Sequence, residues 1–356
     1  MRERLLILGG AGFVGSSLAL GLKSLFPGSD ITCFDNLRRR GSELNLPRLR
    51  GQNIHFVHGD IRSSADLDTA TLGVPEVVID CSAEPSVLAG VGSPEYVLRT
   101  NLVGTINVLE LCRRSRSRLL FLSTSRVYSV PALRRIRLNE QPTRFCLVPV
   151  QSEPHVSLEG VTEKFSTAGF RSLYGTTKLA SEMIIEEYRE AFALKAIINR
   201  CGVLTGPWQM GKVDQGVFVL WVAAHCFPRS LEYAGFGGMG KQVRDLLHVD
   251  DLLKLVHHQL EHFDDLDGEV FNVGGGSNCS LSLLETTALC REITGETIEI
   301  RPNPQERPGD VPIFITDNSK VMARTGWRPQ KTARSTLEDI YRWIKANETT
   351  LRPVLS

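Results

Sequence analysis

The string YGTTK places a tyrosine and a lysine, Tyr174 and Lys178, four residues apart. Residues at this spacing lie on one face of a helix, so the two side chains can act together. A phenol is a poor base at neutral pH unless a nearby cation lowers its pKa by stabilising the phenolate, and the Lys178 ammonium could do this. Because Tyr-x-x-x-Lys is common by chance, an unreactive pair on a helix surface is the alternative.

A hydroxyl residue, Thr124, follows the apolar run at 119–122. A hydroxyl at the end of a buried strand would project from the edge of a sheet, where it could bond a substrate oxygen beside the tyrosine. Together with Tyr174 and Lys178 it forms a set suited to hydride transfer at a carbinol carbon. We therefore expect Thr124, Tyr174 and Lys178 to be catalytic.

The string GGAGFVG at 9–15 comes directly after the apolar run at 5–8. Glycines here permit a tight turn, close approach of the backbone to a pyrophosphate, and close packing of a helix on the strand. A helix that starts in this string would present free amides and a positive dipole to phosphates. The string predicts dinucleotide binding, and a glycine turn without a ligand is the alternative. The glycines of the string that we expect to serve the cofactor are Gly9, Gly12 and Gly15.

Acidic residues follow the next two predicted strands. Asp35 lies 20 residues after Gly15 and suits the two ribose hydroxyls of NAD, whereas it would repel the extra phosphate of NADP. The arginines at 38–40 could accept that phosphate, so NADP stays an alternative, but NAD is the expected cofactor. Asp60 could reach the adenine side, and an Asp that only forms a turn is equally compatible with its position.

The elements that must position these residues alternate between short apolar runs and helix-length segments across the first 200 residues. This alternation predicts an α/β fold, a Rossmann-type doubly wound parallel sheet with ligands at the carboxyl edge of its strands. Strands are predicted at 5–8, 31–35, 54–58, 77–80, 119–123 and 196–200. Helices are predicted to begin near Gly12, Ser63, Pro94 and Tyr174.

The length of 356 residues is enough for about two domains. We expect residues 1–203 to form the NAD-binding domain, with 244–277 returning to it. A smaller α/β substrate-binding domain would take 204–243 and 278–350. The stretch 129–173 has several prolines and few periodic apolar positions, and it is interpreted as a long functional loop.

Composition excludes several classes of protein. The chain has 41 basic and 40 acidic residues, a balance that favours neither a nucleic-acid partner nor a polybasic membrane surface. Its eight cysteines show no CxxC pair and no zinc spacing, so they are interpreted as free thiols and no metal is expected. No apolar run approaches 18 residues, and the run near the start is too short for a signal-peptide core. We expect a cytoplasmic protein.

From about residue 5 to residue 344 the chain resembles the extended short-chain dehydrogenase/reductases of the nucleotide-sugar epimerase/dehydratase family. The resemblance is carried by GGAGFVG, FDNL (34–37), HGDIR (58–62), STSRVY (123–128), YGTTK, RDLLHVDDL (244–252) and RPGD (307–310). Within this family it is most similar to enzymes that epimerise carbon 2 of a CDP-hexose. That similarity is carried by FDNLRRRG (34–41), DQG (214–216) and GKQVRDLLH (240–248).

The resemblance implies a set of site residues. Catalysis would fall to the three residues already named. NAD would be held by Gly9, Gly12, Phe13, Val14, Gly15, Asp35, Asn36, Arg38, Asp60, Ile61, Ala83, Tyr174 and Lys178. The nucleotide sugar would be bound by Thr124, Gln215, Arg244 and Arg307. Two Arg forks suit a pyrophosphate, although surface or ion-paired arginines are the alternative.

The implied activity is NAD-dependent epimerisation through a transient keto-sugar, of the type that converts CDP-paratose to CDP-tyvelose. Dehydratases of the family carry an Asp-Glu pair directly after the catalytic Thr; this chain has Ser125 and Arg126, so dehydration is not expected. Where many relatives have His-x-Ala-Ala, it has the segment 80–84, DCSAE. The alternatives are a 4-epimerase, an NAD(P)-dependent sugar reductase or dehydrogenase, and a non-catalytic dinucleotide-binding or RNA-binding relative. The resemblance also implies a homodimer or homotetramer.

Overall fold

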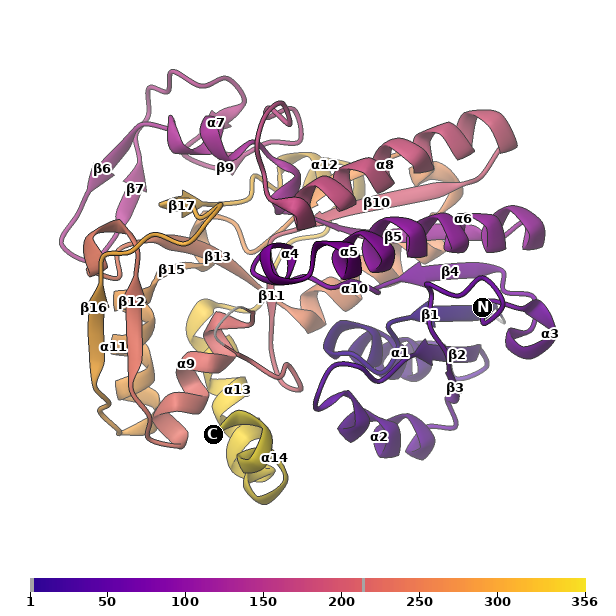
Figure 1. Cartoon of the computed structure of the whole chain (residues 1–356), viewed down its shortest axis with the longest axis horizontal. Coiled ribbons are helices and arrows are strands. Elements are labelled where there is room, and N and C mark those ends of the chain that lie inside the picture. The colour runs from indigo at the N-terminus through magenta and orange to yellow at the C-terminus, as the bar shows by residue number, and fades with distance from the viewer. Residues whose placement is uncertain (1–2, 213–214) are drawn as a thin grey trace. The chain divides into compact units, whose positions relative to one another are not determined.

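A computed structural model describes residues 3–212 and 215–356, and its main element is a seven-stranded sheet in the order β14-β10-β5-β4-β1-β2-β3 (Figure 1). The pairings of β1 with β2 and β4, of β2 with β3, and of β4 with β5 are parallel. All six predicted strands are confirmed within this sheet. Its strands are β1 (Arg4–Leu8), β2 (Asp30–Asp35), β3 (His55–His58), β4 (Val77–Asp80), β5 (Arg118–Thr124), β10 (Ala196–Cys201) and β14 (Val270–Val273).

Helices α6 (Gly104–Ser115) and α8 (Leu173–Phe192) lie side by side on one face of this sheet (Figure 1). Val108 of α6 and Ile185 of α8 are fully buried in the same core as Val78 and Phe121 of the sheet. Alternate residues of a strand face opposite sides, so this face takes every second residue of β4 and β5. The Rossmann-type α/β fold predicted from the sequence is confirmed.

Three of the four predicted helix starts are confirmed. Helix α1 spans Phe13–Leu25, α5 spans Pro94–Leu98, and α8 begins one residue before Tyr174. The start near Ser63 is wrong, because Ser63 and Asp66 hydrogen-bond to each other in a loop. The helix that follows, α3 (Thr69–Leu72), has only four residues.

The chain divides into two compact units. The first comprises Met1–Val127, Leu173–Arg200 and Leu252–Phe271, and the second comprises Tyr128–Ser172, Cys201–Asp251 and Asn272–Ser356. Residues 128–172 therefore group with the second unit, although they were expected in the first. Of the segment 244–277, only Leu252–Phe271 groups with the first unit, through most of α10 (Val249–Glu261) and the start of β14.

The second unit is an α/β body with its own sheet. Strand β13 (Val243–His248) pairs with β11 (Val203–Thr205), β15 (Ser280–Ser282) and β17 (Ile313–Phe314), and β12 (Leu231–Ala234) pairs with β16 (Ile300–Asn303). Helices α9 (Val217–Cys226), α11 (Leu283–Thr294) and α13 (Ala333–Ala346) pack on one another. A capping box of Ser282 and Glu285 starts α11.

The stretch interpreted as a long loop contains regular structure, so that interpretation is wrong. Ser129 caps α7 (Val130–Arg134), β6 (Leu138–Glu140) pairs with β7 (Phe145–Leu147), and β8 (Val156–Ser157) pairs with β9 (Gly160–Val161). These elements are too short to show a clear period in the sequence. The remaining α-helices are α2 (Leu46–Gly51), α4 (Ala89–Gly92), α12 (Ser319–Thr325) and α14 (Glu348–Leu355).

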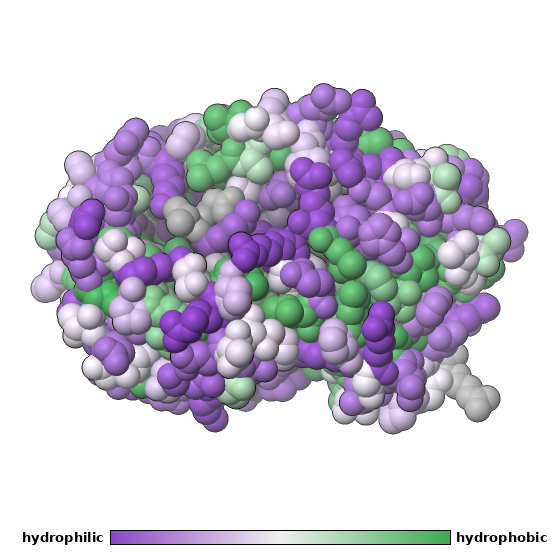
Figure 2. Space-filling model, turned by 60° about the horizontal axis from the view of Figure 1, so that its bottom comes forward, coloured by the Kyte–Doolittle hydropathy of each residue, from purple (hydrophilic) through white to green (hydrophobic). Residues whose placement is uncertain are grey.

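Hydrophobic residues gather in patches among hydrophilic ones on the face shown in Figure 2. Among the described residues, no helix has the length and apolar character needed to cross a membrane. All eight cysteines are free, and five of them are buried. Within 3–212 and 215–356, no cluster of three or more His, Cys, Asp or Glu side chains could hold a metal ion.

Candidate active site

At two positions of the turn between β1 and α1, a side chain could not be added without strain. Gly9 has a φ of +68°, and a Cβ on Gly15 would lie 2.2 Å from the Gly9 carbonyl oxygen. Gly12 stands at the N-cap of α1 without a side-chain cap, and the first turn holds no acidic residue. The first amides of α1, those of Phe13 and Val14, thus belong to an uncapped helix start, a site that suits a pyrophosphate.

Asp35 ends β2 beside this turn. Its carboxylate accepts the N–H of Ala11 at 3.2 Å and the N–H of Leu37 at 2.7 Å. Burial raises the pKa of Asp35, and the backbone hydrogen bonds and His58 oppose that rise. The predicted ribose-binding carboxylate therefore lies next to the glycine turn, as NAD binding requires.

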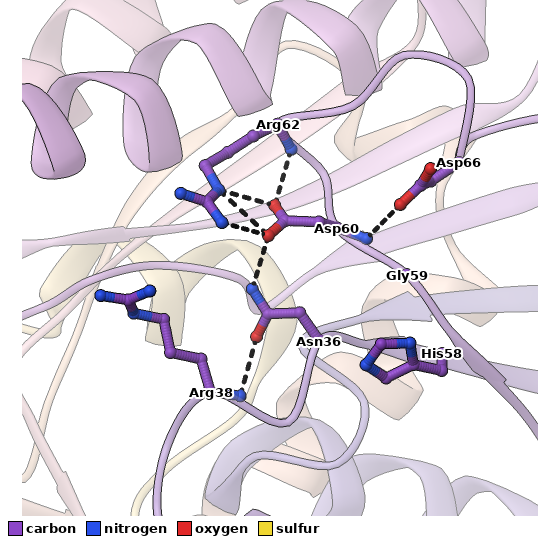
Figure 3. Close-up of a pocket in the computed structure, with 7 residues that line it drawn as sticks. All are labelled: Asn36, Arg38, His58, Gly59, Asp60, Arg62 and Asp66. Carbon is purple, nitrogen blue, oxygen red and sulfur yellow. Dashed lines mark hydrogen bonds and ion pairs between the residues drawn. The ribbon is translucent and has the colours of Figure 1, made fainter.

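A pocket of about 250 Å³ opens at the ends of β2 and β3 (Figure 3). In it, Asn36 donates to Asp60 at 2.9 Å, and Arg62 forms an ion pair with Asp60 at 2.6 Å. The hydrogen bonds from Arg62 lower the pKa of Asp60 to about 2, so this carboxyl is ionised at neutral pH. The Arg38 guanidinium stacks 4.1 Å from the centroid of the Tyr96 ring. A polar, charged pocket beside Asp35 could hold the adenosine end of a dinucleotide.

Two more predicted cofactor residues, Ile61 and Ala83, follow strands β3 and β4. Ile61 is buried, and its carbonyl accepts a hydrogen bond from Asn107 at 2.9 Å. Ala83 follows β4 and is half-buried. Neither Arg62 nor Tyr96 was predicted as a site residue, although Arg62 stands in the string HGDIR, directly after Ile61.

The three candidate catalytic residues all belong to the first unit and are all buried. Thr124 is the last residue of β5 and is 7% exposed, while Tyr174 and Lys178 of α8 are 8% and 2% exposed. The Lys178 Nζ lies 3.8 Å from the centroid of the Phe121 ring. Tyr174 and Lys178 therefore do not form a pair on the helix surface, while their catalytic role stays a prediction. Helix α8 packs on β5 and on the 3₁₀ turn that follows it (Ser125–Val127).

Helix α8 is held in place by a π-turn at Arg99–Val103, a type of irregularity frequent at functional sites. Within this turn, the Asn101 side chain donates to the Thr177 hydroxyl at 3.2 Å and exchanges hydrogen bonds with the backbone of Glu84. Its carbonyl accepts the Ser181 hydroxyl at 3.2 Å. Asn101 thus ties α8 to the segment after β4. The sequence analysis missed it because nothing in the residue pattern marks a π-turn.

A buried ion pair supports the same helix from the sheet. Glu182 of α8 pairs with Arg200 of β10 at 2.7 Å, and their side chains are 6% and 11% exposed. Ser123 of β5 also donates to Glu182. These contacts join α8 to two strands and fix the helix that carries Tyr174 and Lys178.

The candidate substrate residues other than Thr124 lie in the second unit. Arg244 of β13 forms an ion pair with Asp310 at 2.5 Å, and the N–H of Asp310 bonds the Arg307 carbonyl at 3.1 Å. The two arginines are thus linked through Asp310, and Arg244 is an ion-paired arginine, one of the alternatives raised above. Gln215 is half-buried and exchanges backbone hydrogen bonds with Lys212. Asp214, in the string DQG, lies outside the described residues.

Comparison with known proteins decides the family. Residues 5–274 match the model of the NAD dependent epimerase/dehydratase family. The chain belongs to this family. It is 32% identical to the CDP-paratose 2-epimerase of Salmonella typhi, over 96% of this chain and 99% of that protein.

The solved structures of an epimerase and of a dehydratase share the fold, each at 25% sequence identity. The UDP-glucose 4-epimerase of Thermus thermophilus in complex with NAD has a TM-score of 0.75, with 96% of this chain and 99% of that chain covered. The dTDP-glucose 4,6-dehydratase of Bacillus anthracis in complex with NAD has a TM-score of 0.77, with 99% of each chain covered. NAD is the cofactor of this epimerase/dehydratase, and the glycine turn, Asp35 and the uncapped start of α1 fit it.

Proposed function

We propose that this family member is a 2-epimerase of a CDP-hexose that interconverts CDP-paratose and CDP-tyvelose. The observation that carries the proposal is the buried set of Thr124, Tyr174 and Lys178, because it could move the proton of a sugar hydroxyl while NAD takes and returns the hydride, but has no acid–base pair for elimination. Ser125 and Arg126 follow Thr124 in a 3₁₀ turn, and neither suits the removal of water. The similarity to a CDP-paratose 2-epimerase over almost the whole chain supports the choice of carbon 2 and of CDP.

The protein's own residues would move the proton. Tyr174, as a phenolate, would take the proton of the sugar hydroxyl, and the Lys178 ammonium would stabilise that phenolate. Thr124 would hydrogen-bond the same sugar oxygen and orient it. When bound, NAD supplies the acceptor and donor of the hydride. After the keto-sugar turns its other face, the Tyr174 hydroxyl would return the proton.

Different residues would bind the cofactor and the nucleotide sugar. The amides at the start of α1, together with Asp35, Asn36 and Asp60, would hold the dinucleotide, and Arg38 would line its adenosine end. Arg244 and Arg307 would bind the diphosphate of the sugar nucleotide, and Gln215 would also contact the nucleotide sugar. A firm hold on the diphosphate and a loose hold on the hexose would let the sugar turn over during the reaction.

The test is to incubate the NAD-loaded protein with CDP-paratose and to follow the sugar by NMR. We expect CDP-tyvelose to form without accumulation of NADH. The Tyr174→Phe variant should bind NAD normally and lose turnover by at least about a hundredfold, because the proton acceptor is gone. A change at carbon 4 of a UDP-hexose would identify a 4-epimerase, and stoichiometric NADH would identify a dehydrogenase. Unchanged sugars with tight binding of NAD or RNA would indicate a non-catalytic relative.

We also propose that the protein pairs with a second copy through α8 and the π-turn beside it. Val103 of that turn and Met183 of α8 are 42% and 65% exposed, although both are apolar. Exposed apolar side chains on neighbouring helices favour burial against a partner. Light scattering after gel filtration should give a dimer or tetramer, and charged substitutions at both positions should yield a monomer.

A further inference from the structure

A second ionisable group, Asp80, lies in the first unit close to the candidate catalytic lysine. Asp80 is the last residue of β4 and is only 1% exposed. It stands in register with Phe121 of β5, and the Lys178 Nζ lies 3.8 Å from the centroid of that Phe121 ring. Val78, two residues earlier, belongs to the core covered by α6 and α8, so Asp80 faces the same helices.

Within the described part of the chain, only one of the two carboxylate oxygens of Asp80 accepts hydrogen bonds. One carboxylate oxygen accepts the N–H of Ser82 at 2.9 Å and also the Ser82 hydroxyl. The other oxygen has no hydrogen-bond partner among the described residues. A buried carboxylate with a bare oxygen is costly unless a cation compensates its charge.

Lys178 from α8 is the cation whose charge acts on Asp80. Burial raises the pKa of Asp80, and the positive charge of Lys178, followed by the hydrogen bonds from Ser82, opposes that rise. From α6, the thiol of Cys112 also faces Asp80; burial raises its pKa and the carboxylate adds to that, so the thiol stays neutral. The partners of Asp80 in the sheet, Leu8 of β1 and Phe121 of β5, are apolar.

We propose that Asp80 is a positioning residue that, as a carboxylate, keeps Lys178 protonated and aimed at Tyr174. The kinetic part of this inference rests on the proposed function. The charge of Asp80 would stabilise the ammonium and, less strongly, oppose the phenolate of Tyr174. Asp80 therefore sets the pH range in which the pair of Tyr174 and Lys178 works.

Removal of the negative charge of Asp80 should move the pH range in which Tyr174 and Lys178 work. In Asp80→Asn, Lys178 should lose its proton at a pH about one unit lower than in the wild type. The basic limb of the profile of kcat/KM against pH should move down by a similar amount. The acidic limb should move in the same direction by less, because the Tyr174 phenolate then forms more easily.

The lysine can be observed without any sugar substrate. Protein labelled with ¹³Cε-lysine is titrated by NMR, and the Lys178 signal is assigned from its loss in Lys178→Arg. We expect a midpoint about one pH unit lower in Asp80→Asn and a smaller decrease in Ser82→Ala, which removes only a hydrogen bond that stabilises the carboxylate. If Asp80→Asn does not fold, the titration of Ser82→Ala tests the inference: a lower Lys178 midpoint supports it and an unchanged midpoint overturns it.

A matched control is Asp245→Asn in the second unit. Asp245 is also a fully buried carboxyl with an oxygen that lacks a hydrogen-bond partner among the described residues, but the main influences on its pKa are burial and hydrogen bonds rather than a lysine charge. This variant should change neither the two limbs of the pH profile of kcat/KM nor the titration midpoint of Lys178, even if it lowers the stability of the protein.

Two failures can be told apart. An unchanged Lys178 midpoint in Asp80→Asn would overturn the role of Asp80, because a purely structural carboxyl lowers stability and rate without moving a titration. If the wild type epimerises no CDP-hexose while the midpoint still moves, the proposed function fails and the coupling between Asp80 and Lys178 stands.

Discussion

Replacement of Gly15 by alanine tests whether the glycine turn is shaped for the cofactor. A Cβ at this position would lie 2.2 Å from the Gly9 carbonyl oxygen and 2.9 Å from the Gly10 Cα, whereas ordinary contacts begin near 3.4 Å. The backbone would have to open by about 1 Å, and overpacking of this kind costs about 1–3 kcal/mol. Because the displaced atoms are those that would approach a pyrophosphate, we expect NAD affinity to fall at least about tenfold, which corresponds to about 1.4 kcal/mol.

The assay is titration calorimetry with NAD, combined with urea unfolding. The matched control is Gly51→Ala at the end of α2, where an added Cβ meets no atom within 4 Å. This control should bind NAD like the wild type and unfold at the same urea concentration or a higher one. If Gly15→Ala bound NAD with unchanged affinity, the close approach of cofactor and turn would be refuted.

Three further predictions concern the first unit. Thr124→Ala should lower kcat about 10- to 100-fold because a hydrogen bond is lost, whereas Thr124→Ser should keep most of the wild-type kcat. Steady-state kinetics of epimerisation measure both values. Arg200→Met should cost about 3–5 kcal/mol in urea unfolding by leaving the buried Glu182 carboxylate unpaired, and the added change Glu182→Leu should recover most of it. Arg62→Ala should remove about 1–2 kcal/mol of stability above pH 4. The pKa of Asp60 is lowered to about 2 in the folded state, so the ion pair contributes its full stability above the unfolded pKa near 4. The difference in unfolding free energy between Arg62→Ala and the wild type should therefore vanish as the pH falls towards 2.

The sheet and the glycine turn could be predicted from the sequence because their signals are local. Apolar runs identified six strands, and the spacing between Gly15 and Asp35 placed a carboxylate next to the turn, where the structure has it. The Tyr174 and Lys178 pair was ambiguous in the sequence. Only tertiary packing shows that both side chains are buried.

Features that depend on contacts distant in sequence could not be predicted. The π-turn at Arg99–Val103 carries Asn101, whose side chain hydrogen-bonds to residues 17 and 76 positions away. The ion pair of Arg244 with Asp310 joins residues 66 apart. In 129–173, hairpins of two or three residues per strand leave no readable period, so regular structure was mistaken for a loop.

The central claim is that one hydrogen leaves carbon 2 of the sugar and returns to its opposite face. The direct test is to run the conversion of CDP-paratose in D₂O with the NAD-loaded protein and to examine carbon 2 of the product by NMR and mass spectrometry. We expect CDP-tyvelose that keeps protium at carbon 2. Deuterium at carbon 2 would contradict it, because the hydrogen would then have come from solvent.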